Sequence, residues 1–158
     1  MSVARLLTPL ARGLNSLQSL FALGTRLWVG WVFLKSGYLK VTAWDTTLSL
    51  FQDEYHVPLL PPALAAVAGT AGELVFSALL ILGIGGRVPA LGLFAVNALA
   101  VISYAHVLFE EGFEAAIGQH YLWGYMLVVL AIYGAGAITV DRLTWERTPN
   151  PALSPGRG

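Results

Sequence analysis

The sequence contains no cysteine and few charged residues, and each shortage excludes a class of protein. Without cysteine the chain forms no disulfide, binds no iron–sulfur cluster through thiolates, and attaches no haem covalently. Charged residues make up 11% of the chain, whereas soluble domains carry about 25%, so too few are present to cover a water-facing surface. The formal net charge is zero, which leaves no footprint for nucleic acid. A redox role would therefore need a partner protein or a cofactor held without covalent bonds.

Long apolar stretches account for most of what is present. Four of them hold about 20 residues each, the length with which a helix crosses a hydrocarbon core of about 30 Å. They lie at residues 20–41, 62–84, 87–109 and 121–140. None alternates with the two-residue period of a membrane strand, so helices are predicted. We therefore expect an all-α integral membrane protein, a four-helix bundle in contact with the lipid bilayer.

The two ends of the chain differ from this central part. Residues 1–19 carry apolar side chains at helical spacing beside Arg5 and Arg12, which predicts a short amphipathic helix on the membrane surface. Pro9 would interrupt such a helix, and a frayed polar leader is the alternative. Residues 20–143 form the predicted transmembrane domain. Residues 144–158 are rich in proline and glycine, which predicts a disordered tail.

The charges in the loops and tails predict the orientation. With four spans, six arginines fall on one side: Arg5, Arg12, Arg87, Arg142, Arg147 and Arg157. The opposite loops hold acids: Asp45, Asp53, Glu54, Glu110, Glu111 and Glu114. The positive-inside rule assigns the arginine-bearing side to the cytoplasm. We therefore predict that both termini are cytoplasmic.

Ionisable residues inside the spans are the first candidates for a functional site, because each costs at least ~2.5 kcal/mol to insert. Arg26 shares one face of the first span with Gly30, Gly37 and Lys40. Small residues allow close helix packing, so this face is predicted to touch another helix. Lys40 lies near the outer end, where its side chain can also reach the interface as an anchor.

Glu73 lies at the middle of the second span. A lone carboxylate there would take up a proton, and a cationic partner is the alternative. Arg26 is the preferred partner, and Lys35, on the opposite face of the first span, is the competing one. Asn97 of the third span is a third polar group at this depth. The ion pair either forms a functional polar centre or only fixes the helix register.

Two histidines flank the short loop between the third and fourth spans. His106 and His120 are predicted to come near each other and to form a polar mouth with Glu110, Glu111 or Glu114. Histidine and carboxylate can ligate a metal, but no compact ligand spacing is present, and no metal site is assigned. The alternatives are ordinary polar residues at a wet interface or hydrogen-bond partners of a quinone head group.

Three motifs together resemble a known family. The first span reads R-L-W-V-G-W-V-F-L-K-S-G-Y-L-K from Arg26 to Lys40, and the second carries Glu73 before L-L-I-L-G-I-G-G-R, which ends at Arg87. The last motif, G-A-G-A-I-T-V-D-R-L, has Ala135 where the family commonly has proline. In this order the motifs resemble the DoxX family of small bacterial membrane proteins, roughly over residues 20–143.

The resemblance implies a four-helix bundle in the bacterial inner membrane and a link to respiratory redox chemistry. A quinone is the expected cofactor, with an electron donor supplied by a partner protein. The hypothesis names Arg26, Glu73 and Asn97 as the catalytic set, in which Arg26 polarises a carbonyl oxygen and Glu73 carries protons. The expected quinone-binding residues are Arg26, Lys40, Glu73, His106 and His120.

Two further functions stay open. The first alternative is a non-enzymatic scaffold or accessory protein that serves periplasmic redox-enzyme maturation or metal handling, with the acidic loops as its contact surface. A transporter ranks last, because four spans suffice only as a homodimer and no discontinuous-helix pattern is present. A quinone extracted with the protein would favour the redox subunit, and a co-purified soluble partner without quinone would favour the scaffold.

Overall fold

The computed structural model describes residues 3–145, and every regular element in that range is a helix. The helices are α1 (Val3–Thr42), α2 (Trp44–Asp53), α3 (Pro62–Leu82), α4 (Val88–Ser103), α5 (Ala105–Leu108), α6 (Glu114–Tyr133) and α7 (Val140–Trp145). The predicted all-α fold is confirmed.

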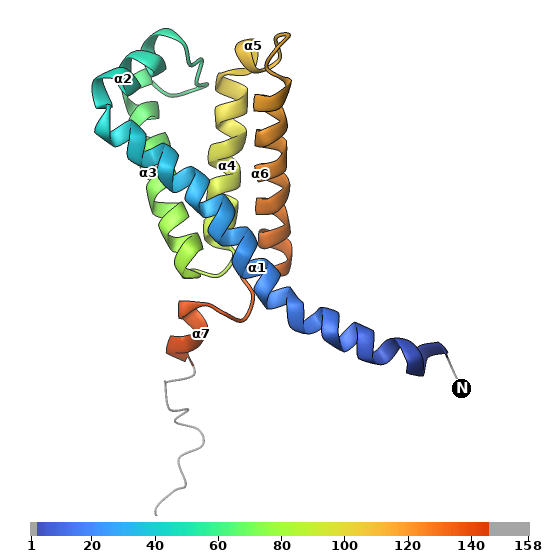
Figure 1. Cartoon of the computed structure of the whole chain (residues 1–158). Coiled ribbons are helices and arrows are strands. Elements are labelled where there is room, and N and C mark those ends of the chain that lie inside the picture. The colour runs from blue at the N-terminus through green and yellow to red at the C-terminus, as the bar shows by residue number, and fades with distance from the viewer. Residues whose placement is uncertain (1–2, 146–158) are drawn as a thin grey trace, which may run out of the picture.

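Four of the helices form the bundle. α3, α4 and α6 run roughly alongside one another, and α1 crosses them obliquely (Figure 1). α1 packs chiefly against α3 and also touches α6, while α4 packs between α3 and α6. α2 and α5 lie at one end of the bundle, and α7 lies at the other. The short helices therefore cap a core of four long ones.

The long helices are suited to a membrane. Three helical segments are long and apolar enough to cross one, namely Leu17–Thr42, Pro62–Leu82 and Glu114–Tyr133. α4 is as apolar, but its 16 residues are fewer and cover only about 24 Å at 1.5 Å per residue. Large apolar side chains such as Phe21, Trp28 and Tyr125 are exposed on the outside of the bundle. The chain is a multi-pass membrane protein.

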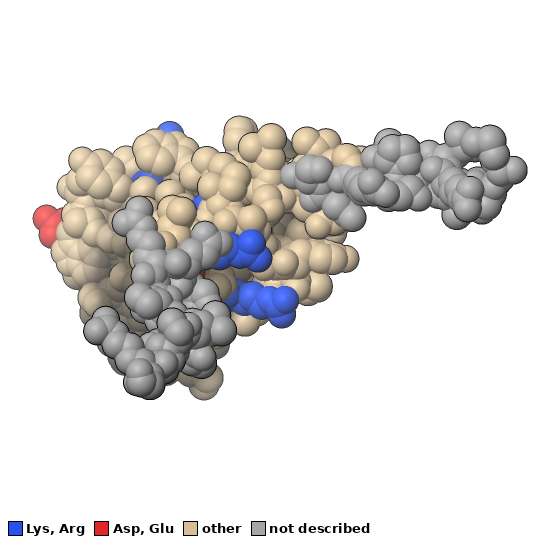
Figure 2. All heavy atoms as spheres, turned by 90° about the horizontal axis from the view of Figure 1, so that it is seen from below, with Lys and Arg blue, Asp and Glu red and all other residues tan. Residues whose placement is uncertain are grey.

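The two ends of the bundle differ in the sign of their exposed charges. We call the end with α2 and α5 the acidic end, because Asp45, Asp53 and Glu111 are exposed there. The opposite end, with the α3–α4 turn and α7, is the arginine end and exposes Arg87 and Arg142. Seen from below, most of the visible surface is uncharged, with a few prominent basic groups (Figure 2). The assignment of the arginine end to the cytoplasm stays a prediction.

Two span boundaries predicted from hydropathy are wrong. The third stretch was expected to continue to residue 109, but α4 ends at Ser103 and the backbone turns at Tyr104 before α5. The fourth was expected at residues 121–140, but α6 starts and ends seven residues earlier. Gly134 and Gly136 have φ angles of 88° and 82°, so the apolar residues after Tyr133 form a loop instead of continuing the helix. Hydropathy counts these residues as apolar and does not register the backbone break.

The structure describes most of the predicted N-terminal amphipathic segment, from residue 3 onward. α1 begins at Val3 and runs through Pro9 without interruption, so the amphipathic segment and the first span are one helix. Its N-terminal part extends beyond the other helices (Figure 1). Its placement on the membrane surface stays a prediction, and most of the predicted disordered tail, residues 146–158, lies outside the described residues.

The core holds α1 and α3 close together. Val29, Leu80, Leu93 and Leu127 are buried at its centre. A Cβ atom built on Gly30 would lie 2.7 Å from Ile81 Cγ1, and one on Gly37 would lie 2.9 Å from Leu74 Cγ. Only glycine permits this approach, so the predicted contact of the Gly30–Gly37 face with another helix is confirmed.

Candidate functional site

A cavity of ≈ 400 Å³ lies in the half of the bundle nearer the acidic end. Residues of all six helices from α1 to α6 line it, together with the α2–α3 loop. Most of the lining is apolar, with aromatic walls from Phe33, Phe51 and Trp123. Ligand cavities in proteins hold roughly 300–1,000 Å³, so this one accepts a small molecule or a head group. Its polar side chains are those of Ser36, Lys40, Tyr55, Glu73, Ser103, Tyr104 and His120.

An ion pair lies in the wall of this cavity. The Lys40 ammonium donates a hydrogen bond to Glu73 Oε1 and another, of 3.3 Å, to Ser36 Oγ. The Glu73 side chain is 6% exposed and that of Lys40 is 24% exposed. Glu73 Oε2 is buried without a hydrogen-bond partner. An unpaired carboxylate oxygen in a dry site is costly, so it is a natural acceptor for a ligand's proton or hydrogen bond.

His120 reaches the cavity from α6 and is held by Asn97 of α4. Asn97 Nδ2 donates to the backbone oxygen of His120 over 3.0 Å, and Asn97 Oδ1 lies 2.8 Å from His120 Nδ1. The backbone oxygen only accepts, which fixes the amide so that Oδ1 accepts from Nδ1–H. In the neutral ring Nε2 is then the free acceptor. Asn97 thereby selects the tautomer of a cavity histidine, and Trp123 packs edge-on against the same ring at 5.0 Å.

Tyr55 and Tyr104 line the cavity at the acidic end. Their rings pack edge to face with centroids 5.1 Å apart, and Tyr104 donates a 3.1 Å hydrogen bond to Glu54 Oε2. Burial raises the pKa of Tyr55, and the negative charges of Glu73 and Glu54 raise it further. The Tyr55 hydroxyl therefore keeps its proton at neutral pH and is a hydrogen-bond donor in the cavity wall.

Arg26, predicted as the partner of Glu73, is placed elsewhere. Its guanidinium donates to the backbone oxygens of Ala135, over 2.9 Å, and of Ile138. Both belong to the loop that joins α6 to α7 at the arginine end. A Cβ atom on Gly83 would lie 2.8 Å from Arg26 Nη1, so glycine at the end of α3 makes room for the guanidinium. The predicted Arg26–Glu73 pair is wrong, and Arg26 stabilises a loop.

The geometry of α1 explains this correction. Gly37 is the α1 residue that faces Glu73, since a Cβ atom there would lie 3.1 Å from Glu73 Cβ. Arg26 lies eleven residues earlier on α1, which is about 16 Å along the helix axis. Lys40 lies within one turn of Gly37 and reaches the carboxylate instead. The competing partner, Lys35, is exposed on another face of α1, so this alternative is also wrong.

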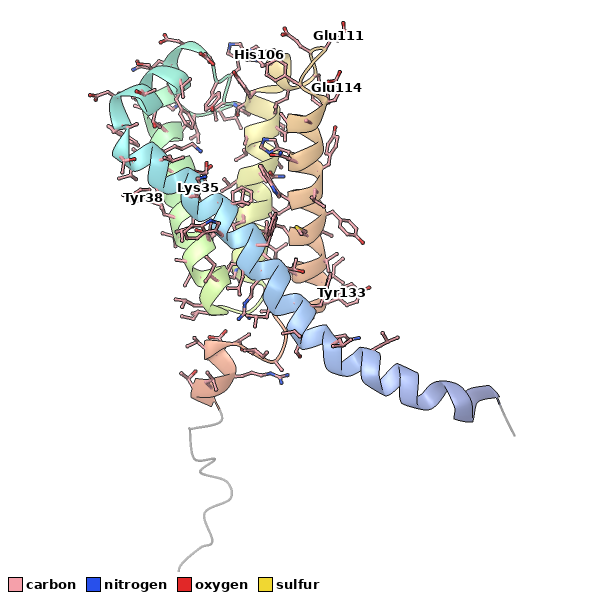
Figure 3. All side chains as sticks on the ribbon, in the orientation of Figure 1. Lys35, Tyr38, His106, Glu111, Glu114 and Tyr133 are labelled. Carbon is pink, nitrogen blue, oxygen red and sulfur yellow. The ribbon has the colours of Figure 1, made fainter. Side chains whose placement is uncertain are left out.

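The predicted meeting of His106 and His120 is wrong as well. His106 belongs to α5 and stacks on His56 of the α2–α3 loop, with ring centroids 4.5 Å apart. His120 lies within α6, turned toward Asn97. Figure 3 shows His106 and Glu111 at the acidic end, outside the helices of the bundle. Because His106 on α5 stacks on the α2–α3 loop while His120 on α6 turns toward Asn97, the two histidines do not form a common mouth.

No three side chains of the metal-ligating types converge within residues 3–145. Glu114 accepts from the Gly112 backbone N–H over 3.2 Å, and the other loop acids are exposed. Tyr133 is 81% exposed at the far end of α6 (Figure 3). The loop acids and Tyr133 thus lie outside the cavity.

The structure brings Lys40, Glu73 and His120 to one cavity, with Asn97 behind the histidine. Sequence reasoning missed the remaining polar groups. Ser36 lies one turn before Lys40, so helical spacing would have revealed it. Tyr55 and Tyr104 come from a loop and a helix junction whose positions no periodicity indicates. The arrangement combines a cationic donor, a carboxylate and an imidazole between aromatic walls, which suits a flat molecule with polar groups and permits proton exchange with it.

Comparison with known proteins agrees with the first two motifs, and the third, from Gly134 to Leu143, lies outside the matched residues. The family model described as DoxX matches residues 21–107, more than half of the 158 residues. The match covers α1 from Phe21 onward, α2, α3 and α4, and so includes Lys40, Glu73 and Asn97. No curated protein and no solved structure matches the chain. By the family match, this chain is a member of the DoxX family.

Proposed function

We propose that this protein is the membrane subunit of a quinone-linked redox system in a bacterial inner membrane, and that its cavity receives the quinone head group. The observation that carries the proposal is the unpartnered oxygen of Glu73 in an apolar cavity that also holds Lys40 and His120. A head group with two carbonyl oxygens on a flat ring matches the donors, the acceptors and the aromatic walls. The volume of ≈ 400 Å³ is sufficient for a substituted ring.

The residues of the cavity have distinct roles in this proposal. A quinone, when bound, exchanges two electrons together with two protons. Lys40 donates a hydrogen bond to a carbonyl oxygen, with Ser36 holding the ammonium in place. Glu73 takes up or releases a proton at Oε2, the oxygen that has no hydrogen-bond partner in the protein. His120 exchanges a proton at Nε2, and Asn97 keeps the ring in the required tautomer.

The electrons come from a partner protein. The chain has no cysteine and so no thiol–disulfide couple of its own. The partner is proposed to deliver electrons from the acidic end, because the cavity lies closer to that end of the bundle. The earlier hypothesis gave Arg26 the carbonyl contact, and Lys40 now takes that role.

The first experiment measures quinone bound to the purified protein. The protein is isolated from bacterial membranes in mild detergent and extracted with organic solvent, and the quinone is quantified against the phospholipid that remains. We expect a quinone-to-phospholipid ratio well above that of the membrane. His120→Leu is expected to lose this enrichment, and His106→Leu, which changes a histidine outside the cavity, is expected to keep it.

Enrichment that is absent from the unaltered protein, or equal in both histidine variants, would contradict the proposal. A soluble protein that co-purifies without quinone would favour the scaffold function instead. Melting temperatures of both variants, measured in the same detergent, separate loss of binding from loss of folding.

A further inference from the structure

The exposed rim of the cavity is entirely apolar. Of the residues that line the cavity, three are exposed, namely Leu60, Ala68 and Leu99. The polar lining residues, including Glu73 and His120, are buried or half-buried behind them. An opening designed for water-soluble ligands would place polar side chains at its rim. The pattern here, apolar outside and polar inside, is the reverse.

Two of these three residues lie within helices, and Leu60 lies in the α2–α3 loop. Ala68 is the seventh residue of α3, about 9 Å along the axis from its start. Leu99 lies one turn before the end of α4. Both positions are inside the apolar part of the two helices. A side opening at this level faces the hydrocarbon chains of the lipid. Polar groups exposed to those chains are costly, which explains why the rim is apolar.

Near this rim, space is left between α3 and α4 beside Gly69. Farther toward the arginine end the two helices touch, because a Cβ atom on Gly72 would lie 2.9 Å from Val96 and one on Gly92 would lie 2.6 Å from the Phe76 ring. At Gly69 an added Cβ atom would meet only Phe51 Cζ, at 3.6 Å, and no atom of α4 within 4 Å. The space beside Gly69 belongs to the cavity.

We infer that the cavity opens sideways into the bilayer between α3 and α4 and takes its ligand from the membrane. The ligand is an amphiphile whose polar head reaches Lys40, Glu73 and His120 and whose apolar chain leaves past Ala68 and Leu99. This inference rests on the proposed quinone function and narrows it, because it selects quinones with a hydrocarbon tail over tail-free, water-soluble ones. Apolar contacts along the rim would then contribute to affinity in proportion to the area that the tail buries.

The test blocks the rim without changing the polar groups. Ala68→Trp places a bulky ring at the opening, and Ala71→Trp places the same ring on an exposed position of α3 that does not line the cavity. Binding of a tailed quinone analogue and of its tail-free head group is measured by titration calorimetry in detergent. We expect Ala68→Trp to weaken the tailed analogue about tenfold or more and the tail-free one much less, with Ala71→Trp close to the unaltered protein.

A second measurement does not depend on a variant that folds. A tailed analogue with a photoreactive diazirine on the first carbons of the tail is cross-linked to the unaltered protein, and the sites are mapped by mass spectrometry. Cross-links at Leu60, Ala68 or Leu99 support the inference. Cross-links concentrated at Tyr55, Val57 and Tyr104 would overturn it, as would equal weakening of both analogues by Ala68→Trp.

Failure of the proposed function looks different. If the unaltered protein binds neither analogue, the quinone function itself is contradicted, and the inference falls with it. If it binds both analogues equally and Ala68→Trp changes neither, the quinone function stands, and the side opening is wrong.

Discussion

Two basic residues, fourteen positions apart on the same face of α1, have different surroundings. Arg26 is 3% exposed and donates to two backbone oxygens of the α6–α7 loop. Lys40 is partly exposed and donates to two side chains in the wall of a cavity. Backbone oxygens do not titrate, so these two hydrogen bonds of Arg26 hold a loop in place. The partner of Lys40 can gain and lose a proton, so this site can take part in chemistry.

The same contrast extends to the two ends of the bundle. At the arginine end, Asp141 accepts hydrogen bonds from the backbone N–H groups of Gly85 and Gly86, over 2.8 and 3.1 Å. These hydrogen bonds join the α3–α4 turn to the start of α7. In the half nearer the acidic end, a carboxylate oxygen of Glu73 is buried without a partner. Arg26 Nε is also buried without a partner, but Arg26 does not line the cavity, whereas Glu73 does and can therefore bind a ligand there.

The largest expected effect is at Arg26. Arg26→Met leaves the oxygens of Ala135 and Ile138 without their donor and removes two charge-assisted hydrogen bonds, with a loss of about 4 kcal/mol of unfolding free energy. The measurement is reversible unfolding by denaturing detergent in mixed micelles. Lys35→Met, at an exposed basic position on the same helix, is the control and should change stability little. Equal stability of the Arg26 and Lys35 variants would show that the guanidinium does not support the loop.

A smaller effect is expected at the ion pair. Lys40→Met and Glu73→Gln should each cost about 2 kcal/mol, less than a fully buried pair, because Lys40 can reach the surface and Glu73 can take up a proton. The double variant should lose less than the sum of the two, since no charge is then stranded. Strictly additive losses in the same unfolding assay would mean that the two side chains do not interact.

Asp141→Ala should have the smallest effect on stability. It removes an acceptor from two exposed backbone N–H groups that water can reach, so about 1 kcal/mol is expected. Quinone binding per folded molecule should be unchanged, because the cavity lies in the other half of the bundle. A variant that folds normally but loses bound quinone would contradict the division between the two ends.

Much of this arrangement follows from the sequence. Span length and hydropathy predict the four-helix bundle, and the Gly30–Gly37 face predicts a close contact of α1 with another helix. The sequence also indicates Glu73 as a buried group with a cationic partner. It does not select among Arg26, Lys35 and Lys40, because the choice depends on where α1 crosses α3. A shift of the crossing point by a few turns would exchange the partners.

Other parts of the structure could not be predicted, because they depend on backbone conformation in loops or on contacts between distant residues. The α6–α7 loop is as apolar as a helix, and its two glycines with positive φ become evident only from the backbone. The tautomer of His120 depends on a contact with Asn97, 23 positions away in the chain. Tyr55 enters the cavity from a loop. Hydropathy and helical period describe single helices and contain no information on how loops return to the bundle.

The most direct test of the account compares two lysines of one helix. Lys40→Met and Lys35→Met make the same chemical change five positions apart, one in the cavity and one on the exposed face. The dissociation constant of a tailed quinone analogue is measured by titration calorimetry for both variants and the unaltered protein. The account predicts that Lys40→Met weakens binding about tenfold or more, the equivalent of one charge-assisted hydrogen bond, and that Lys35→Met leaves it unchanged. Equal dissociation constants for the two variants would contradict the assignment of the cavity as the quinone site.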